Sequence, residues 1–121
     1  MSNLYNYKAK VVKVVDGDTV DVVMELGFDI SYSARVRLLG INTPESRTRD
    51  LVEKAAGLEA KDFVVQWLED RDNIVILSTQ LDGKGKFGRV LGMICDKDTE
   101  EVLNETLVKE GHAVHYDGGK R

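Results

Sequence analysis

The first third of the chain carries the alternation of apolar and polar residues that is typical of strands. Residues 7–15 and 19–26 are rich in β-branched side chains, and an Asp-Gly-Asp turn separates them. Residues 30–40 form a third segment with a period of two. Its apolar face holds Ile30, Tyr32, Ala34, Val36 and Leu38. The pattern therefore predicts three strands in an antiparallel meander.

The rest of the chain alternates between helical and strand-like patterns. Residues 51–69 have the spacing of an amphipathic helix, whose stable part we expect to begin at Gly57 because glycine weakens a helix. Short apolar strands are predicted at 73–79 and 89–95, and a second amphipathic helix at 102–111. The apolar face of the long helix holds Val52, Ala56, Phe63, Val64, Trp67 and Leu68.

This order of elements limits the architecture. Five short strands with an inserted helix favour an α+β domain, built on a five-stranded OB-fold β-barrel with two to three α-helices. The 121 residues contain no internal repeat or linker and fit a single domain over residues 1–121. We expect an ordered core over about residues 7–116 and a loose tail over residues 117–121.

Composition excludes several classes of protein. A chain with 42% hydrophobic and 31% charged residues is neither collagen-like nor disordered. No apolar run approaches the roughly 20 residues of a membrane helix, and the first ten residues lack the apolar centre of a secretory signal. Because Cys95 has no internal disulfide partner, we expect a cytoplasmic protein with a buried, inert thiol. A processed secreted chain without disulfides would have the same composition.

Charge is distributed unevenly along a chain whose formal net charge is −4. Residues 35–49 carry four arginines against one acid, and residues 80–92 carry three cations against one acid. The remainder is acidic, which argues against indiscriminate binding to nucleic acid. Since phosphate contacts need local positive charge, these two segments are the candidates for a phosphate-binding surface.

The turn between the first two strands is the first candidate for chemistry. Asp-Gly between strands is most often an ordinary hairpin turn. Asp18, however, follows the turn directly at the start of a strand, where its carboxylate can point an oxygen at a hard cation. The residues alone leave both interpretations open.

A second candidate lies in residues 37–45. Taken singly, Arg37, Thr43 and Glu45 fit a solvated strand residue, turn chemistry and a surface charge. Together with Asn42 they place a guanidinium, an amide oxygen, a backbone carbonyl before proline and a carboxylate within nine residues. A guanidinium offers paired donors to a phosphate, and a carboxylate can accept a proton from water.

The glycine-rich segment 83–89 is the third candidate. A hairpin of this kind with lysines is commonly a mobile loop. The functional alternative is a basic flap over phosphates, with Arg89 as a second guanidinium that stabilises charge in the transition state.

Two histidines have the spacing of some metal sites. His112 and His115 are three residues apart, but on an extended segment such residues face opposite sides. No cysteine lies near enough in sequence to complete a zinc site, so we expect none there.

The sequence resembles the staphylococcal nuclease (thermonuclease) family in four motifs that follow the family's order. They are the Asp-Gly-Asp-Thr turn, the segment from Arg37 to Thr-Pro-Glu, the Phe-Gly-Arg hairpin and the final helix with Asn104. The resemblance covers residues from about 7 to 116, and the ordered set is much more specific than any one motif. It implies an OB-fold barrel and Ca²⁺-dependent hydrolysis of phosphodiester bonds in DNA and RNA, which leaves 3′-phosphates.

The resemblance also implies a set of metal ligands. Asp18 matches the calcium carboxylate, and Thr43 matches the residue whose backbone carbonyl binds calcium. Asn42 stands where the best-known members have a second calcium aspartate. Asp16 fits the acid of the turn that lies outside the direct ligands.

Catalytic and substrate-binding roles are implied in the same way. Arg37 and Arg89 resemble the arginines that clamp the scissile phosphate, and Glu45 matches the glutamate that positions or deprotonates the attacking water. The expected contacts to the nucleotide come from Lys86, Phe87 and Tyr116. We expect a monomer that acts on single-stranded or frayed nucleic acid and does not associate with a membrane.

Two rival functions compete with this prediction. The first is a catalytically weak nuclease-like module that only binds nucleic acid or a protein partner. Such modules usually lack several of the family's catalytic residues, which this chain retains. The second is a general OB-fold oligonucleotide binder, which exposed aromatic residues on the second and third strands would favour; only Phe28 and Tyr32 are available there.

Overall fold

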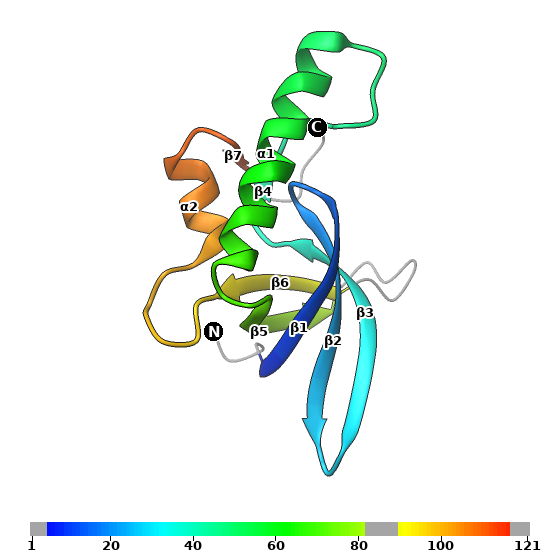
Figure 1. Cartoon of the computed structure of the whole chain (residues 1–121), viewed down its shortest axis with the longest axis vertical. Coiled ribbons are helices and arrows are strands. Elements are labelled where there is room, and N and C mark those ends of the chain that lie inside the picture. The colour runs from blue at the N-terminus through cyan, green and yellow to red at the C-terminus, as the bar shows by residue number, and fades with distance from the viewer. Residues whose placement is uncertain (1–4, 82–89, 117–121) are drawn as a thin grey trace.

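Five strands close into a barrel in the order β1–β2–β3–β6–β5 (Figure 1). The computed structural model describes residues 5–81 and 90–116. All neighbouring strands are antiparallel except β3 and β6, which run parallel. This arrangement confirms the predicted meander and the α+β class with an OB-fold barrel. The strands are β1 (Tyr5–Asp16), β2 (Thr19–Gly27), β3 (Ile30–Leu38), β5 (Ile74–Leu81) and β6 (Val90–Cys95).

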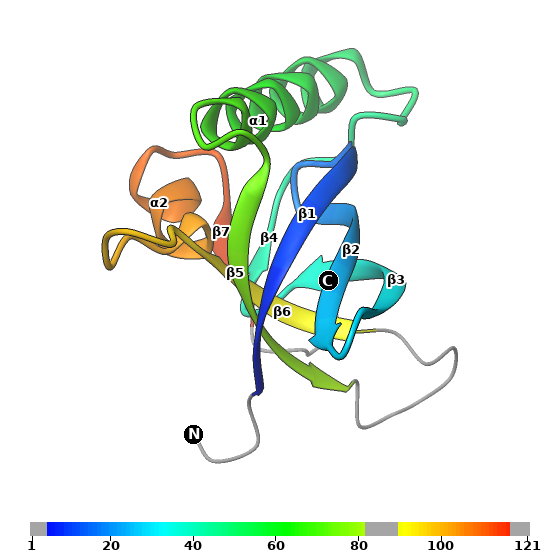
Figure 2. The same cartoon turned by 60° about the horizontal axis from the view of Figure 1, so that its bottom comes forward.

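Two helices and a small second sheet complete the described part of the chain. Helix α1 (Leu51–Glu69) lies across one end of the barrel, and the short α2 (Leu103–Lys109) lies beside it (Figure 2). Strands β4 (Ile41–Asn42) and β7 (Val114–His115) pair antiparallel, a contact between short segments that the sequence pattern did not predict. Within the described residues, neither helix is long and apolar enough to cross a membrane.

The core fills the barrel and the space beneath the helices. Fully burying one of these aliphatic side chains contributes about 1.5–3 kcal/mol relative to leaving it exposed. The largest fully buried side chains are Val20, Val22, Val36, Leu38, Val64, Leu68, Val75, Leu77, Ile94, Leu103 and Leu107.

The hairpin of β2 and β3 extends beyond the barrel (Figure 1). In its outer half the apolar face predicted for β3 is exposed, which corrects the expectation from the sequence. Val36 and Leu38 are buried, but Ile30 and Tyr32 are 56% and 50% exposed. These two side chains are exposed because the outer part of the hairpin has no neighbouring strands in the part of the chain that the structure describes. Strand β3 pairs with β6 only over its last three residues, and the pairing of β1 with β2 ends at Met24. Nothing among the described residues is layered over the outer part of the hairpin.

Helix α1 spans the whole predicted segment from Leu51, although we expected its stable part to begin only at Gly57. The Asp50 carboxylate caps it by accepting hydrogen bonds from the backbone N–H groups of Val52 and Glu53, at 3.0 and 3.2 Å. Val52 was expected on the apolar face, yet it is 82% exposed, because the first turn projects past the end of the barrel.

A buried amide ties α2 to the barrel. The Asn104 side chain is 3% exposed and donates to the backbone carbonyls of Leu39 and Gly92, at 2.9 and 3.1 Å. Its oxygen accepts from the N–H of Ile94 at 3.1 Å. Three backbone groups of the β3–β4 turn and β6 are thereby satisfied, so this asparagine has a structural role.

Candidate active-site cleft

Three separate segments meet at the end of the β1–β2 hairpin and form one polar cleft of about 510 Å³. The β2–β3 register places Thr19 opposite Arg37, and the N–H of Leu38 donates to the carbonyl of Asp18 at 2.8 Å. The segment after β4 then folds over the same end. We call this hollow the Asp18 cleft; it is lined by Asp16, Asp18, Thr19, Arg37, Thr43, Glu45 and Arg47.

Asp18 lies at the base of the cleft and is only 8% exposed. One carboxylate oxygen accepts from the backbone N–H of Thr43 at 3.1 Å, and the other accepts from the Thr19 hydroxyl at 3.1 Å. These bonds fix the carboxylate beside the backbone of Thr43. The two residues predicted to share a metal are therefore neighbours, although 25 positions separate them in sequence.

Arg37 spans the cleft between strand β3 and strand β4. One guanidinium nitrogen donates to the Leu38 carbonyl at 2.9 Å and lies 3.6 Å from a carboxylate oxygen of Asp18. The other terminal nitrogen donates to the side-chain oxygen of Asn42. The guanidinium therefore contacts two of the three expected metal ligands.

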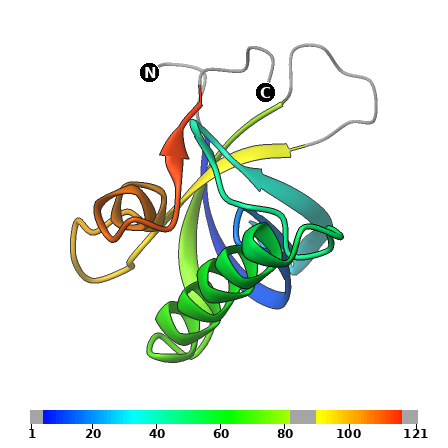
Figure 3. The same cartoon turned by 90° about the horizontal axis from the view of Figure 1, so that it is seen from above.

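The loop that carries Glu45 runs from β4 to the start of α1 (Figure 3), and two hydrogen bonds hold it in place. The Ser46 hydroxyl donates to the Asp16 carboxylate at 2.7 Å, and the backbone N–H of Glu45 donates to the Glu53 carboxylate at 3.2 Å. Gly57 of α1 is buried against this loop. A Cβ added there would lie 2.5 Å from the Glu45 carbonyl, so glycine permits the close approach. The Glu45 residue itself is exposed.

The donor atoms near Thr43 suit a hard cation such as Ca²⁺. Asp18, Asn42 and the Thr43 carbonyl all offer oxygen, which is the ligand atom that Ca²⁺ prefers. The Thr43 hydroxyl lies buried under Gly17 and, of the buried side-chain polar atoms in the described residues, is the one without a hydrogen-bond partner. The described residues contain no group of three His, Cys, Asp or Glu side chains that could hold a metal. A cation here would therefore depend on one carboxylate and several neutral oxygens.

A second hollow of about 560 Å³ adjoins the cleft and shares Thr43 with it. We call it the Tyr116 groove, since residues 111–116 form one wall. The Tyr116 ring centre lies 5.9 Å from the guanidinium carbon of Arg37, and the Tyr116 N–H donates to the Gly40 carbonyl at 2.8 Å. The tyrosine expected to contact the nucleotide is thus next to the cleft.

Three of the expected site residues cannot be placed. Lys86, Phe87 and Arg89 lie outside the described residues. The remaining seven all lie in the Asp18 cleft or the Tyr116 groove. Sequence reasoning missed Ser46, which anchors the loop, and interpreted Gly57 only as a weak point in a helix. A polar residue next to Thr-Pro-Glu and a glycine inside a helical pattern were the available signals.

The two histidines do not converge. His112 packs against the Phe63 ring with centroids 4.9 Å apart, whereas His115 lies exposed in β7. Cys95 is half-buried rather than fully buried as expected, because it ends β6 at the barrel edge. Burial still raises the pKa of its thiol, which favours the protonated, unreactive form.

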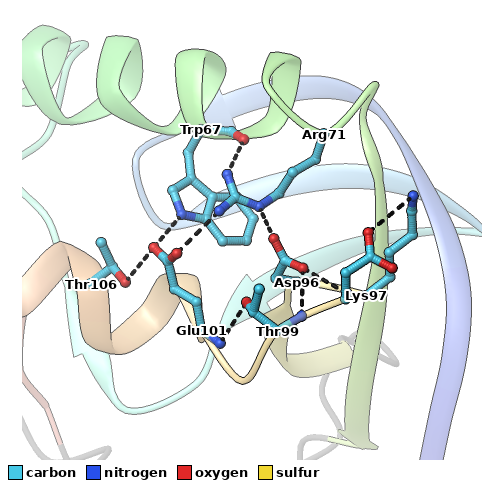
Figure 4. A network of polar contacts seen from close by, with 8 residues as sticks. Trp67, Arg71, Asp96, Lys97, Thr99, Glu101 and Thr106 are labelled. Carbon is cyan, nitrogen blue, oxygen red and sulfur yellow. Dashed lines mark hydrogen bonds and ion pairs between the residues drawn. The ribbon is translucent and has the colours of Figure 1, made fainter.

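A second arginine–carboxylate cluster lies at the far end of α1 (Figure 4). Arg71 donates to Asp96 at 2.6 Å, to Glu101 at 3.1 Å and to the Trp67 carbonyl at 2.8 Å. Its guanidinium carbon lies 3.5 Å from the centre of the Trp67 ring, and the indole N–H donates to Glu101 at 2.8 Å. We call this the Arg71 cluster.

The Arg71 cluster shifts the titration of both its acids. The backbone N–H of Asp98, followed by the Arg71 side chain, lowers the pKa of Asp96. The Trp67 indole N–H makes the largest contribution to the lowered pKa of Glu101, with Thr106 and Arg71 adding to it and burial opposing it. Both carboxylates are therefore held in their charged form.

Comparison with known proteins agrees with this geometry. Residues 35–121 match the family described as Staphylococcal nuclease homologue. An uncharacterized protein of Methanocaldococcus jannaschii is 33% identical over 92% of this chain and 60% of its own length. A thermonuclease of Staphylococcus hyicus is 31% identical over 93% of this chain and 62% of its own length.

A third relative is the thermonuclease of Staphylococcus intermedius, 34% identical over 85% of this chain and 56% of its own length. The chain therefore spans about three-fifths of the length of the relatives it matches. The family match covers the last part of the strand that carries Arg37, the Glu45 loop and both helices. On this match and on the barrel fold, the chain belongs to the family of staphylococcal nuclease homologues.

Proposed function

We propose that this protein is a Ca²⁺-dependent nuclease that hydrolyses phosphodiester bonds of single-stranded or frayed DNA or RNA and leaves 3′-phosphates. One observation carries the proposal. A buried carboxylate from the β1–β2 turn, a half-buried guanidinium from β3 and an exposed carboxylate from the loop after β4 all line one surface cleft. Relatives named thermonuclease support the same class of reaction.

The metal would be held by Asp18, Asn42 and the backbone carbonyl of Thr43. When bound, Ca²⁺ would offset the charge of a phosphate and favour ionisation of a water molecule. Asp16 would act indirectly, because its carboxylate accepts from Ser46 and so holds the loop that follows Thr43. We expect position 42 to weaken the site, since asparagine keeps an oxygen but removes a negative charge.

The chain's own residues would perform the remaining chemistry. Arg37 would bind the scissile phosphate through its paired donors, and Arg89 would add a second guanidinium. Glu45 would accept the proton of the attacking water, whose oxygen forms a bond to phosphorus as the P–O5′ bond breaks. The leaving O5′ then takes a proton from solvent. Lys86, Phe87 and Tyr116 would contact the nucleotide.

A general oligonucleotide-binding surface is less well supported. Phe28 is 98% exposed and Tyr32 is 50% exposed on the β2–β3 hairpin, as such a surface requires. However, residues 22–34 contain Glu25 and Asp29 and no Lys or Arg. Because this outer part of the hairpin has no cation to bind a phosphate backbone, its aromatic side chains alone do not favour nucleic acid.

The test is to incubate purified protein with single-stranded and duplex DNA, with Ca²⁺ or with a chelator, and to determine the product ends. We expect degradation with Ca²⁺, faster on single strands, and products with 3′-phosphates. Glu45→Gln is the matched control, because it should stay folded and lose most of the activity. Equal degradation in chelator would refute the metal-dependent mechanism, and equal degradation by the Glu45→Gln protein would remove Glu45 from the reaction. Tight binding of DNA without any cleavage would favour the binding-only module.

A further inference from the structure

Arg37 uses the same oxygen atoms that the proposed metal site needs. Its guanidinium donates to the side-chain oxygen of Asn42 and forms an ion pair with Asp18, whose side chain is 12% exposed. A third contact to the Leu38 carbonyl orients the planar group across these two oxygens. Asn42 and Asp18 belong to different segments, so one guanidinium bridges the two sides of the site.

The charges of this arrangement balance. Asp18 supplies one negative charge, Arg37 supplies one positive charge, and Asn42 is neutral. The guanidinium offsets part of the charge of Asp18, which the N–H of Thr43 and the hydroxyl of Thr19 also stabilise by hydrogen bonds. The other charged groups in the cleft are placed differently: Asp16 accepts from Ser46, while Glu45 and Arg47 are exposed.

We propose that Arg37 caps the metal-binding oxygens in the free protein, and that a divalent cation must displace its guanidinium from Asn42 and Asp18. This inference rests on the proposed function. The displaced guanidinium stays in the same cleft, where the phosphate of an incoming nucleic acid can take up its donors. Cation and substrate then bind cooperatively. The cation releases the Arg37 guanidinium to bind phosphate, and bound phosphate keeps the guanidinium away from the metal-binding oxygens.

The first test measures Ca²⁺ binding by titration calorimetry without nucleotide, on wild type, Arg37→Ala, Arg37→Lys and Arg47→Ala. Arg37→Ala should bind Ca²⁺ several-fold more tightly than wild type. Arg37→Lys separates capping from simple charge repulsion, because lysine keeps the charge but lacks the planar fork that reaches both oxygens. We expect it also to bind more tightly than wild type.

Arg47→Ala is the matched control, since it removes a positive charge from the same cleft without touching the cap. Its Ca²⁺ affinity should change much less than that of Arg37→Ala. Equal gains in these two variants, or a wild-type affinity in Arg37→Lys, would overturn the inference while leaving the proposed function intact. If no variant binds Ca²⁺ even with saturating deoxynucleoside 5′-monophosphate, the metal-dependent function fails as well.

A second readout needs no substitution. In ¹⁵N spectra of the wild-type protein, the side-chain Nε–H resonance of Arg37 should shift on addition of Ca²⁺ alone, while that of exposed Arg47 stays in place. An unmoved Arg37 resonance at a Ca²⁺ concentration that saturates calorimetric binding would show that the cap is not displaced.

Discussion

One arginine–carboxylate cluster lies in the Asp18 cleft and another at the C-terminal end of α1, and they are almost equally shielded from solvent. The Arg37 and Arg71 side chains are 17% and 18% exposed, and the Asp18 and Asp96 side chains are both 12% exposed. Their geometry differs. Arg71 lies 2.6 Å from Asp96 and stacks on a tryptophan ring, whereas Arg37 lies 3.6 Å from Asp18 and lines a polar cleft.

The comparison shows that burial alone does not separate a structural arginine from a functional one. Arg71 satisfies two carboxylates, a carbonyl and an aromatic face at short range, so moving it would break several contacts at once. Arg37 contacts its carboxylate at longer range and shares it with the Thr43 N–H. The looser pair beside a cleft is the better candidate for a group that changes partners during a reaction.

The largest expected effect is on turnover at the cleft. Arg37→Ala should lower kcat by about 10²–10³ because it removes one donor to the transition state, with little change in the midpoint of thermal unfolding. Steady-state kinetics and a thermal melt on the same preparation measure both quantities. Arg71→Ala should show the reverse pattern, with near-normal kcat at temperatures where the protein is folded. If the two variants behaved alike, the distinction between the clusters would fail.

The second effect concerns the contact between α1 and the Glu45 loop. Helix propensity alone predicts that Gly57→Ala stabilises the protein by up to about 1 kcal/mol. The added Cβ would lie 2.5 Å from the Glu45 carbonyl, so we expect a net loss within the roughly 1–3 kcal/mol range of overpacking, together with lower kcat as Glu45 is displaced. Denaturant unfolding and kinetics test this.

Ala55→Gly on the exposed side of the same helix is the matched control, because it reports the propensity term by itself. It should destabilise the protein modestly and leave kcat unchanged. A Gly57→Ala protein that is more stable than wild type would mean that the loop does not depend on this close approach.

The smallest effect is the pH dependence of the Arg71 cluster. Asp96 and Glu101 have lowered pKa values in the folded protein, so their stabilisation is fully present above their ordinary values of about 4 and is lost as pH falls through the lowered ones. Arg71→Ala should therefore lower the thermal midpoint by several degrees at neutral pH. The difference from wild type should shrink below about pH 4.

The exposed pair of Arg35 and Asp21 provides the comparison for this experiment. The pair also lowers the pKa of Asp21, but the Arg35 side chain is 59% exposed, and Arg35→Ala should change the melt very little. If the difference in thermal midpoint between wild type and Arg71→Ala stays constant from neutral to acidic pH, the cluster stabilises the fold through the packing of Arg71 on Trp67 alone.

Local patterns in the sequence determined most of the elements of this fold. Alternation over residues 7–40 predicts three strands within one or two residues of their observed ends, and helical spacing predicts the full extent of α1. These signals are local because side chains two or four positions apart share a face whatever lies opposite. The ordered motifs also identified the family and grouped Asp18, Arg37, Thr43 and Glu45 as candidates, and the fold places all four in the Asp18 cleft.

Only the tertiary structure decided which apolar residues are covered and what each polar group contacts. Tyr32 and Val52 fit apolar faces, but they lie where the hairpin and the helix extend past the barrel and are exposed. The periodicity of the sequence does not show whether another element covers a face. Gly57 looks unfavourable within its helix, yet a loop twelve positions earlier requires it. The contact of Arg37 with Asp18 depends on the register of β2 on β3, and local spacing carries no information about which residues of different strands lie together.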